Sequence, residues 1–176
     1  MRQNGSGRDA AFEEFVRNKQ VALVRFAWLV SDGSYAHAED LVQEALIRLY
    51  GRWSDVNDPE AYTRTTISRL NISVWRKLRR ETLRGTPVDR AELDRRLDAL
   101  GGDGRLIRAV RALPPRQRLV IVLRYWCDYG DGEIAETLGC AQATVRSLAH
   151  RGLTRLREVW PPPTQTTTQS ITGRTA

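Results

Sequence analysis

The 176-residue chain lacks long apolar runs. No stretch approaches the roughly 18 consecutive apolar residues that a membrane-spanning helix needs. The polar, glycine-containing start, residues 1–9, also lacks the apolar centre of a secretory signal peptide. These absences predict a protein without an integral membrane segment, which we expect in the cytoplasm.

Cysteine is scarce, and so is histidine. The two cysteines, Cys127 and Cys140, fall in helical patterns with no histidine nearby, whereas a metal site needs about four ligands. We therefore expect no metal and no cofactor. We favour free thiols over a disulfide, and a disulfide remains the alternative. His37 and His150 lie far apart, and no paired acid and base or phosphate-binding glycine loop accompanies them, which disfavours an enzyme.

Lysine is almost absent from a basic chain. The net charge is +7, and apart from Lys19 and Lys77 all of the 28 basic residues are arginine. Such a charge favours a polyanionic partner, nucleic acid before an anionic membrane, and arginine pairs well with phosphates and guanine edges. Codon bias in a GC-rich genome explains the arginine content equally well.

Apolar residues recur with the helical period throughout, so the fold class is all-α, with two small helical domains joined by a flexible linker. Ser34 and Asp58-Pro59 are start signals for helices, Gly139 is a stop signal, and Trp126 is expected to point inward. The predicted helices cover residues 9–30, 35–51, 59–80, 106–113, 115–127, 131–138 and 142–158, with a short charged helix at 88–100. The predicted divisions are a flexible start at 1–8, domains at 9–81 and 105–160, a linker at 82–104 and a disordered Pro- and Thr-rich tail at 161–176.

The helices at 131–138 and 142–158, with Gly139 between them, have the layout of a helix-turn-helix. Apolar residues at 134, 138, 145 and 148 are spaced to close the angle between the two helices. The second helix carries four arginines and one glutamate, and its N-terminal half is the part that reads base edges in this motif. The outward candidates are Gln142, Thr144, Arg146, Ser147, His150 and Arg151. A plain helical hairpin with a solvated basic face is the alternative.

The predicted helix over residues 59–81 is also basic, with six cationic and two acidic side chains. Aromatic residues among these cations could stack on unpaired bases while arginines neutralise phosphates. A core tryptophan beside a solvated face accounts for Trp75 equally well. The candidates for DNA contact are Tyr62, Arg64, Arg69, Trp75, Arg76, Lys77, Arg79 and Arg80.

The helix over residues 35–51 is acidic, with Glu39, Asp40 and Glu44 against Arg48. An acidic face on a basic protein is unsuited to DNA and fits a protein partner, because opposite charges steer docking. A face that serves only solubility remains the alternative.

Three segments together resemble sigma factors of bacterial RNA polymerase. The order and spacing are similar to extracytoplasmic-function sigma factors, in particular the SigE-like actinobacterial group, over roughly residues 10–81 and 105–160. The segments are 38–44 (AEDLVQE), 113–125 (LPPRQRLVIVLRY) and 132–157, which includes GEIAETLGC and TVRS.

The resemblance implies an alternative sigma factor, with region 2 at 9–81 and region 4 at 105–160. Partners would be core RNA polymerase, through its β′ clamp and β subunit, promoter DNA and conceivably an anti-sigma factor, in the cytoplasm at the nucleoid. Residues 53–58 and the 59–81 helix would read and open the −10 element, and the 142–158 helix would read the −35 element. The residues implied to grip the β′ clamp are Asp40, Leu41, Gln43 and Glu44.

The chain departs from the family pattern at a few positions. Ala141 and Ala143 stand where we expect Ser or Thr and Gly, Arg69 where we expect Asn, and Leu148 where several relatives have a polar or basic residue. These departures leave the promoter sequence open. The main competing reading is a dimeric helix-turn-helix regulator that never binds core polymerase; a basic helical protein on anionic membranes fits less well, because no broad apolar face is present.

Overall fold

A computed structural model describes residues 3–31, 34–81 and 104–159. All regular elements within these ranges are helices, as the periodicity predicts. None of them is long and apolar enough to cross a membrane. The predicted helix at 88–100, most of the predicted linker and the tail from 161 onward lie outside the described residues.

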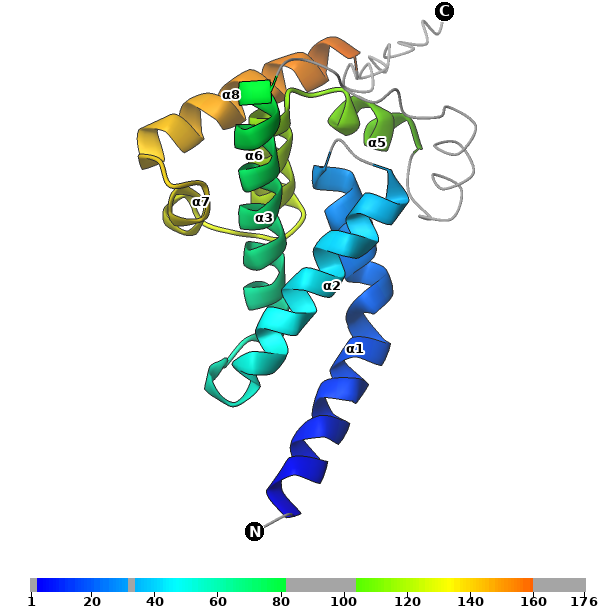
Figure 1. Cartoon of the computed structure of the whole chain (residues 1–176). Coiled ribbons are helices and arrows are strands. Elements are labelled where there is room, and N and C mark those ends of the chain that lie inside the picture. Colours follow the sequence, from blue (N-terminus) through cyan, green and yellow to red (C-terminus); the bar gives the residue numbers. More distant parts are fainter. Residues whose placement is uncertain (1–2, 32–33, 82–103, 160–176) are drawn as a thin grey trace, which may run out of the picture.

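The N-terminal half is a bundle whose three long helices run up, down and up (Figure 1). Its elements are α1 (Gln3–Val30), α2 (Tyr35–Gly51), the short 3₁₀ turn η1 (Trp53–Asp55) and α3 (Pro59–Glu81). The first helix begins at Gln3 rather than at residue 9. Its early turns are fastened to the end of α2, since the Tyr50 hydroxyl donates to Asp9 (2.8 Å) and Arg8 donates to the Tyr50 carbonyl.

The two start signals predicted in this half, Ser34 and Asp58-Pro59, are confirmed. The Ser34 hydroxyl accepts a hydrogen bond from the His37 amide (3.3 Å) at the start of α2. At the start of α3 the Asp58 carboxylate accepts from the Ala61 amide (2.9 Å), and Pro59 is the first helical residue. Each cap satisfies an amide that the helix itself leaves without a partner.

Helix α3 is rich in serine and threonine, which are weak helix formers. The hydroxyls of Thr63, Thr66 and Ser68 turn back and donate to the carbonyls four residues earlier, at 2.6–2.8 Å, so these buried polar groups are satisfied. Asn71 is also buried and donates to the Val30 carbonyl (3.0 Å). Packing against α1 and α2 therefore stabilises this helix more than its intrinsic propensity does.

The C-terminal half contains four shorter helices. These are α5 (Gly104–Arg111), α6 (Pro115–Tyr125), α7 (Asp131–Leu138) and α8 (Gln142–Val159). Helix α5 starts at Gly104, inside the predicted linker and earlier than residue 106. Gly139 ends α7 in the left-handed conformation (φ 61°), as predicted, because glycine has no Cβ to clash there.

The prediction that Trp126 points inward is wrong. Helix α6 ends at Tyr125, and the Trp126 side chain is 59% exposed. The chain then leaves the helical path, with Asp128 in the left-handed region (φ 58°). The helical periodicity that correctly predicts the burial of Leu119 and Leu123 therefore does not extend to residue 126.

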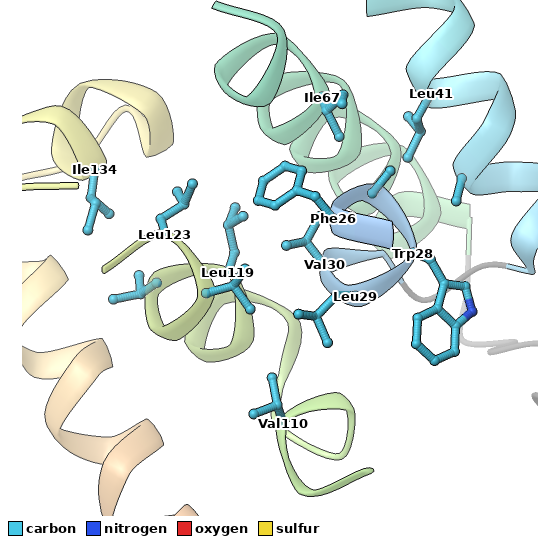
Figure 2. Close-up of a cluster of buried hydrophobic side chains, with 14 of the residues drawn as sticks. Phe26, Trp28, Leu29, Val30, Leu41, Ile67, Val110, Leu119, Leu123 and Ile134 are labelled. Atoms are coloured by element: carbon cyan, nitrogen blue, oxygen red, sulfur yellow. The ribbon is translucent and has the colours of Figure 1, made fainter. Parts of the chain in front are cut away.

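The two halves share one hydrophobic core. Helix α1 packs against α5 and α6, and α3 packs against α7. Figure 2 shows Phe26 and Leu29 of α1 facing Leu119 and Leu123 of α6, with Ile67 of α3 on the other side of Phe26. We call this contact between α1 and α6 the seam. The periodicity predicted the two halves but not their packing against each other.

Helices α6 and α8 pack tightly at Gly152, where a Cβ atom would lie 2.9 Å from Cγ1 of Ile121. We predict that Gly152→Val lowers the free energy of unfolding by about 2 kcal/mol through overpacking. Urea unfolding followed by circular dichroism measures this. Gly132→Ala in α7 is the matched control, because its Cβ would meet only Gln142 at an ordinary 3.5 Å. Equal stability of the two variants would contradict the close packing.

Candidate nucleic-acid interface

Helices α7 and α8 meet as the helix-turn-helix predicted from the sequence. Ile134, Leu138, Val145 and Leu148 are all buried between them. Helix α8 begins at Gln142, which places Ala141 at the cap position with no side-chain acceptor for the first amides. The Ala141 carbonyl still accepts from Thr144 (2.9 Å) and Val145 (3.2 Å), so the helix starts without the capping hydroxyl.

The predicted reading residues of α8 form one outward surface. Gln142, Thr144, Arg146, His150 and Arg151 are exposed, and Ser147 is half-buried beside them. The Ser147 hydroxyl accepts a hydrogen bond from the Arg151 guanidinium (2.7 Å). This bond directs Arg151 along the helix toward its N-terminal end, which is the end that enters the major groove in this motif.

Asp131, at the start of α7, is a neighbour of this surface that the sequence reasoning missed. Its carboxylate pairs with Arg124 of α6 and lies 4.0 Å from Nε of Arg146. The carboxylate thus joins three helices behind the outward surface of α8. An acidic residue at the first position of a helix was visible in the sequence, but its partners on α6 and α8 come from the fold.

The candidates on α3 are spread around the helix. Arg64 is half-buried and pairs with Glu60, which also binds Lys19 of α1 (2.6 Å). Arg69 is exposed and lies 3.5 Å from Glu136 of α7. Tyr62 is half-buried.

Trp75 is half-buried and packs against the core, with its indole N–H covered and unpaired. Its placement agrees with the core alternative for this residue. The side chains of Arg76, Lys77, Arg79 and Arg80 lie outside the described part of the chain.

The turn before α3 divides into a packed and an open part. Trp53 lies against Phe12 and Phe15 of α1, with ring centroids 5.2 and 5.5 Å apart. Residues 54 and 55 and residues 57 and 58 are exposed. The polar end of the turn is therefore the part that is open to a ligand.

Helix α2 presents an acidic outer face. Asp40, Gln43 and Glu44 are exposed, and Glu44 binds Arg48 (2.8 Å) on the next turn. Leu41, predicted with them, is only 6% exposed and points into the core (Figure 2). Ile47 is 68% exposed and follows Asp40 by seven residues, so it shares the outer face of α2, where the sequence reasoning did not name it.

A cavity of about 180 Å³ lies beside the seam. Its lining includes Phe26, Leu29 and Arg64 from the N-terminal half and Ile107, Trp126 and Cys127 from the C-terminal half. Burial raises the pKa of the Cys127 thiol to about 11, against an ordinary value of 9.0. Cys127 and Cys140 are both free, as predicted.

Comparison with known proteins identifies both halves. The family description "Sigma-70 region 2" matches residues 15–81, and "Sigma-70, region 4" matches residues 103–156. The RNA polymerase sigma-E factor of Streptomyces avermitilis is 37% identical over 156 residues, which cover 86% of each chain. The chain therefore belongs to the sigma-70 family of RNA polymerase sigma factors.

Solved structures agree over both halves. The sigma factor RpoE of Bartonella quintana, solved with the anti-sigma factor NepR, superposes with a TM-score of 0.63 at 23% identity, over 85% of this chain and 96% of that one. The extracytoplasmic-function sigma factor SigJ of Mycobacterium tuberculosis has a TM-score of 0.59 at 28% identity, over 82% of this chain and 52% of that one. The resemblance to the SigE-like extracytoplasmic-function group is confirmed.

The burial of Cys127 should make its thiol slow to react with alkylating reagents. Alkylating reagents attack the thiolate, so a pKa of about 11 leaves little reactive form at pH 8. With Cys140 changed to Ser, we expect iodoacetamide to modify the folded protein about 10- to 100-fold more slowly than the urea-unfolded protein. The rate should keep rising with pH beyond 9 in the folded protein. Equal rates in the two states would show that the thiol is open to solvent.

Proposed function

We propose that this chain is an alternative sigma factor that docks on core RNA polymerase through α2, reads the −10 element through α3 and reads the −35 element through α8. The observation that carries the proposal is the separation of charge among these helices. The acidic surface of α2 and the arginine-bearing surface of α8 are both exposed and belong to different halves of one chain. Each can therefore engage a different partner in the same complex.

In this proposal the N-terminal half of α8 reads the −35 element. Arginine pairs with the two acceptors on a guanine edge and glutamine with adenine, and each such pair discriminates by about 1–3 kcal/mol. Arg146 is suited to this role because it is exposed at the first turns of the helix, with Asp131 behind it. Arg151 and His150 lie one turn further along, where phosphate contacts set the register.

Docking on polymerase falls to the exposed face of α2. Asp40, Gln43 and Glu44 supply polar and acidic groups, and Ile47 adds an apolar contact among them. A surface that combines an apolar residue with surrounding charges is typical of a protein interface. Leu41 contributes indirectly, because its burial sets the direction in which this face points.

Opening of the −10 element needs energy that this chain does not supply alone. Extruding a base from the duplex costs a few kcal/mol. Contacts with core polymerase would offset that cost, so we expect the free protein to melt DNA poorly. The open end of the turn at residues 54–58 and the start of α3 are the candidate capture site.

The dimeric regulator is disfavoured by the region 2 match, because that reading gives the N-terminal half no task. We propose that the chain acts without catalytic activity of its own, in the cytoplasm at the nucleoid. An anti-sigma factor is a further candidate partner, supported by the fold shared with a sigma factor solved in complex with one.

Charge reversal on α2 tests the docking role. We expect Asp40→Arg with Gln43→Arg to reduce co-purification with core polymerase at least tenfold, because cations replace the acidic surface that steers docking. Glu14→Arg with Gln20→Arg on α1 makes the same change in net charge at exposed positions and serves as the control. Binding by the first pair that equals the control would refute the assignment.

Truncation on α8 tests the reading role. We expect Arg146→Ala with Arg151→Ala to lower run-off transcription from a cognate promoter at least tenfold, while binding to core polymerase survives. Arg155→Ala with Arg157→Ala, on the C-terminal half of the same helix, should mainly reduce the salt dependence of DNA binding. An undiminished transcript from the first pair would count against base reading by this end of α8.

A further inference from the structure

The first turn of α7 supports the N-terminal end of α8. Asp131, in this turn, points one carboxylate oxygen, Oδ2, at Nε of Arg146 (4.0 Å). The amide nitrogen of Gln142 rests on the same turn, 3.5 Å from the position that a Cβ atom would take at Gly132. Two of the residues predicted to read bases are therefore placed by a neighbouring helix as well as by their own.

The Asp131 carboxylate is itself held in place. Its other oxygen, Oδ1, is shielded from solvent and pairs with the Arg124 guanidinium of α6, a helix that buries Leu119 and Leu123 in the core. The amide groups at the start of α7 also favour an acidic side chain there. The carboxylate is thus anchored on the core side, whereas the Arg146 side chain that it faces is 66% exposed.

The direction of approach leaves the donors of Arg146 available. The carboxylate faces Nε, at the side of the guanidinium, and 4.0 Å is the separation of an ion pair without a hydrogen bond. The contact therefore restrains the direction of the side chain while its N–H groups remain open to the two acceptors on a guanine edge. Arg151 differs, because its guanidinium donates to Ser147 on its own helix.

An exposed arginine without such a support binds DNA less selectively. A long side chain samples many rotamers, and ordering it on one base reduces the free energy of binding. It also reaches phosphate oxygens, and contacts with phosphates carry no sequence information. A carboxylate behind Arg146 restricts its rotamers and repels a nearby phosphate, so it favours the base edge over the backbone.

We propose that Asp131 is a positioning residue for −35 reading, which holds the Arg146 guanidinium toward a guanine edge and away from phosphates. This inference rests on the proposed function and adds to it a residue outside the reading helix. Asp131 acts through Arg146, so its loss should change which sequence is preferred more than how tightly DNA is bound. A partly exposed ion pair changes an equilibrium by up to about fivefold, which sets the scale of the effect.

Base discrimination by the holoenzyme, core polymerase with this chain bound, tests the proposal. The probes are duplexes with a promoter that the wild-type holoenzyme selects from genomic fragments. Each −35 base pair is replaced in turn, and one further duplex has a scrambled −35 element. We expect Asp131→Asn to reduce discrimination about three- to fivefold at the base pair where Arg146→Ala also loses it. Binding to the scrambled duplex should stay level or rise, because a negative charge has been removed.

Two controls separate positioning from a general effect of charge or folding. Asp128→Asn removes the same charge at an exposed residue in the loop before α7, and asparagine also adopts its left-handed conformation (φ 58°). This variant should keep wild-type discrimination. Asp131→Asn in an Arg146→Ala background should have no further effect at the affected base pair, because the two residues act as one unit. Circular dichroism melts check that each variant remains folded.

Weaker binding at every base pair alike would show that Asp131 is only structural and would overturn the proposal, as would unchanged discrimination. In the free protein, the NMR order parameter of the Arg146 Nε–H bond should fall in Asp131→Asn and stay level in Asp128→Asn. Equal values in the two variants would also overturn it. A wild-type holoenzyme that ignores the −35 sequence would instead refute the proposed function, and the NMR comparison would still decide whether Asp131 holds Arg146.

Discussion

The packing of α1 against α6 joins the two halves in the described part of this molecule, and their relative placement depends on it. Phe26 and Leu29 bury their side chains against Leu119 and Leu123, so one core runs through both halves. Burial of a side chain of this size stabilises by about 1.5–3 kcal/mol. Arg111 reinforces the edge of the seam, with its guanidinium 4.0 Å from the Trp28 ring centroid.

The ionic contacts between the halves are weaker than this apolar contact. Glu136 and Arg69 are 81% and 53% exposed, and exposed pairs contribute roughly 0–1 kcal/mol. The apolar seam therefore contributes more than the Glu136–Arg69 pair to holding the halves together.

Local structure followed from the sequence because its causes are local. The caps at Ser34 and Asp58 and the turn at Gly139 depend on a few neighbouring atoms, and the structure has all three. The outward direction of Arg146 on α8 also followed, since its neighbours Val145 and Leu148 are buried.

The remaining features depend on contacts between distant segments. A helical stripe says which side of α1 is buried but not what covers it, so the seam was not predicted. Trp126 was assigned to the core because the period was continued past the end of α6. It was the family resemblance that implied a polymerase contact for Leu41 beside its polar neighbours, and its side chain is buried. The pairing of Asp131 with two arginines likewise needs three helices in place before it can be seen.

A core shared by both halves limits how independently the two halves can evolve. If each half carried its own core, evolution could recombine a region 2 from one paralogue with a region 4 from another, and both halves of the hybrid would still fold. Here such a chimera would join unmatched halves of the seam, for example a new partner for Leu29 opposite an unchanged Leu119. The two halves should accordingly have diversified together, and engineered hybrids should need repacking along α1 and α6 before they fold as one unit.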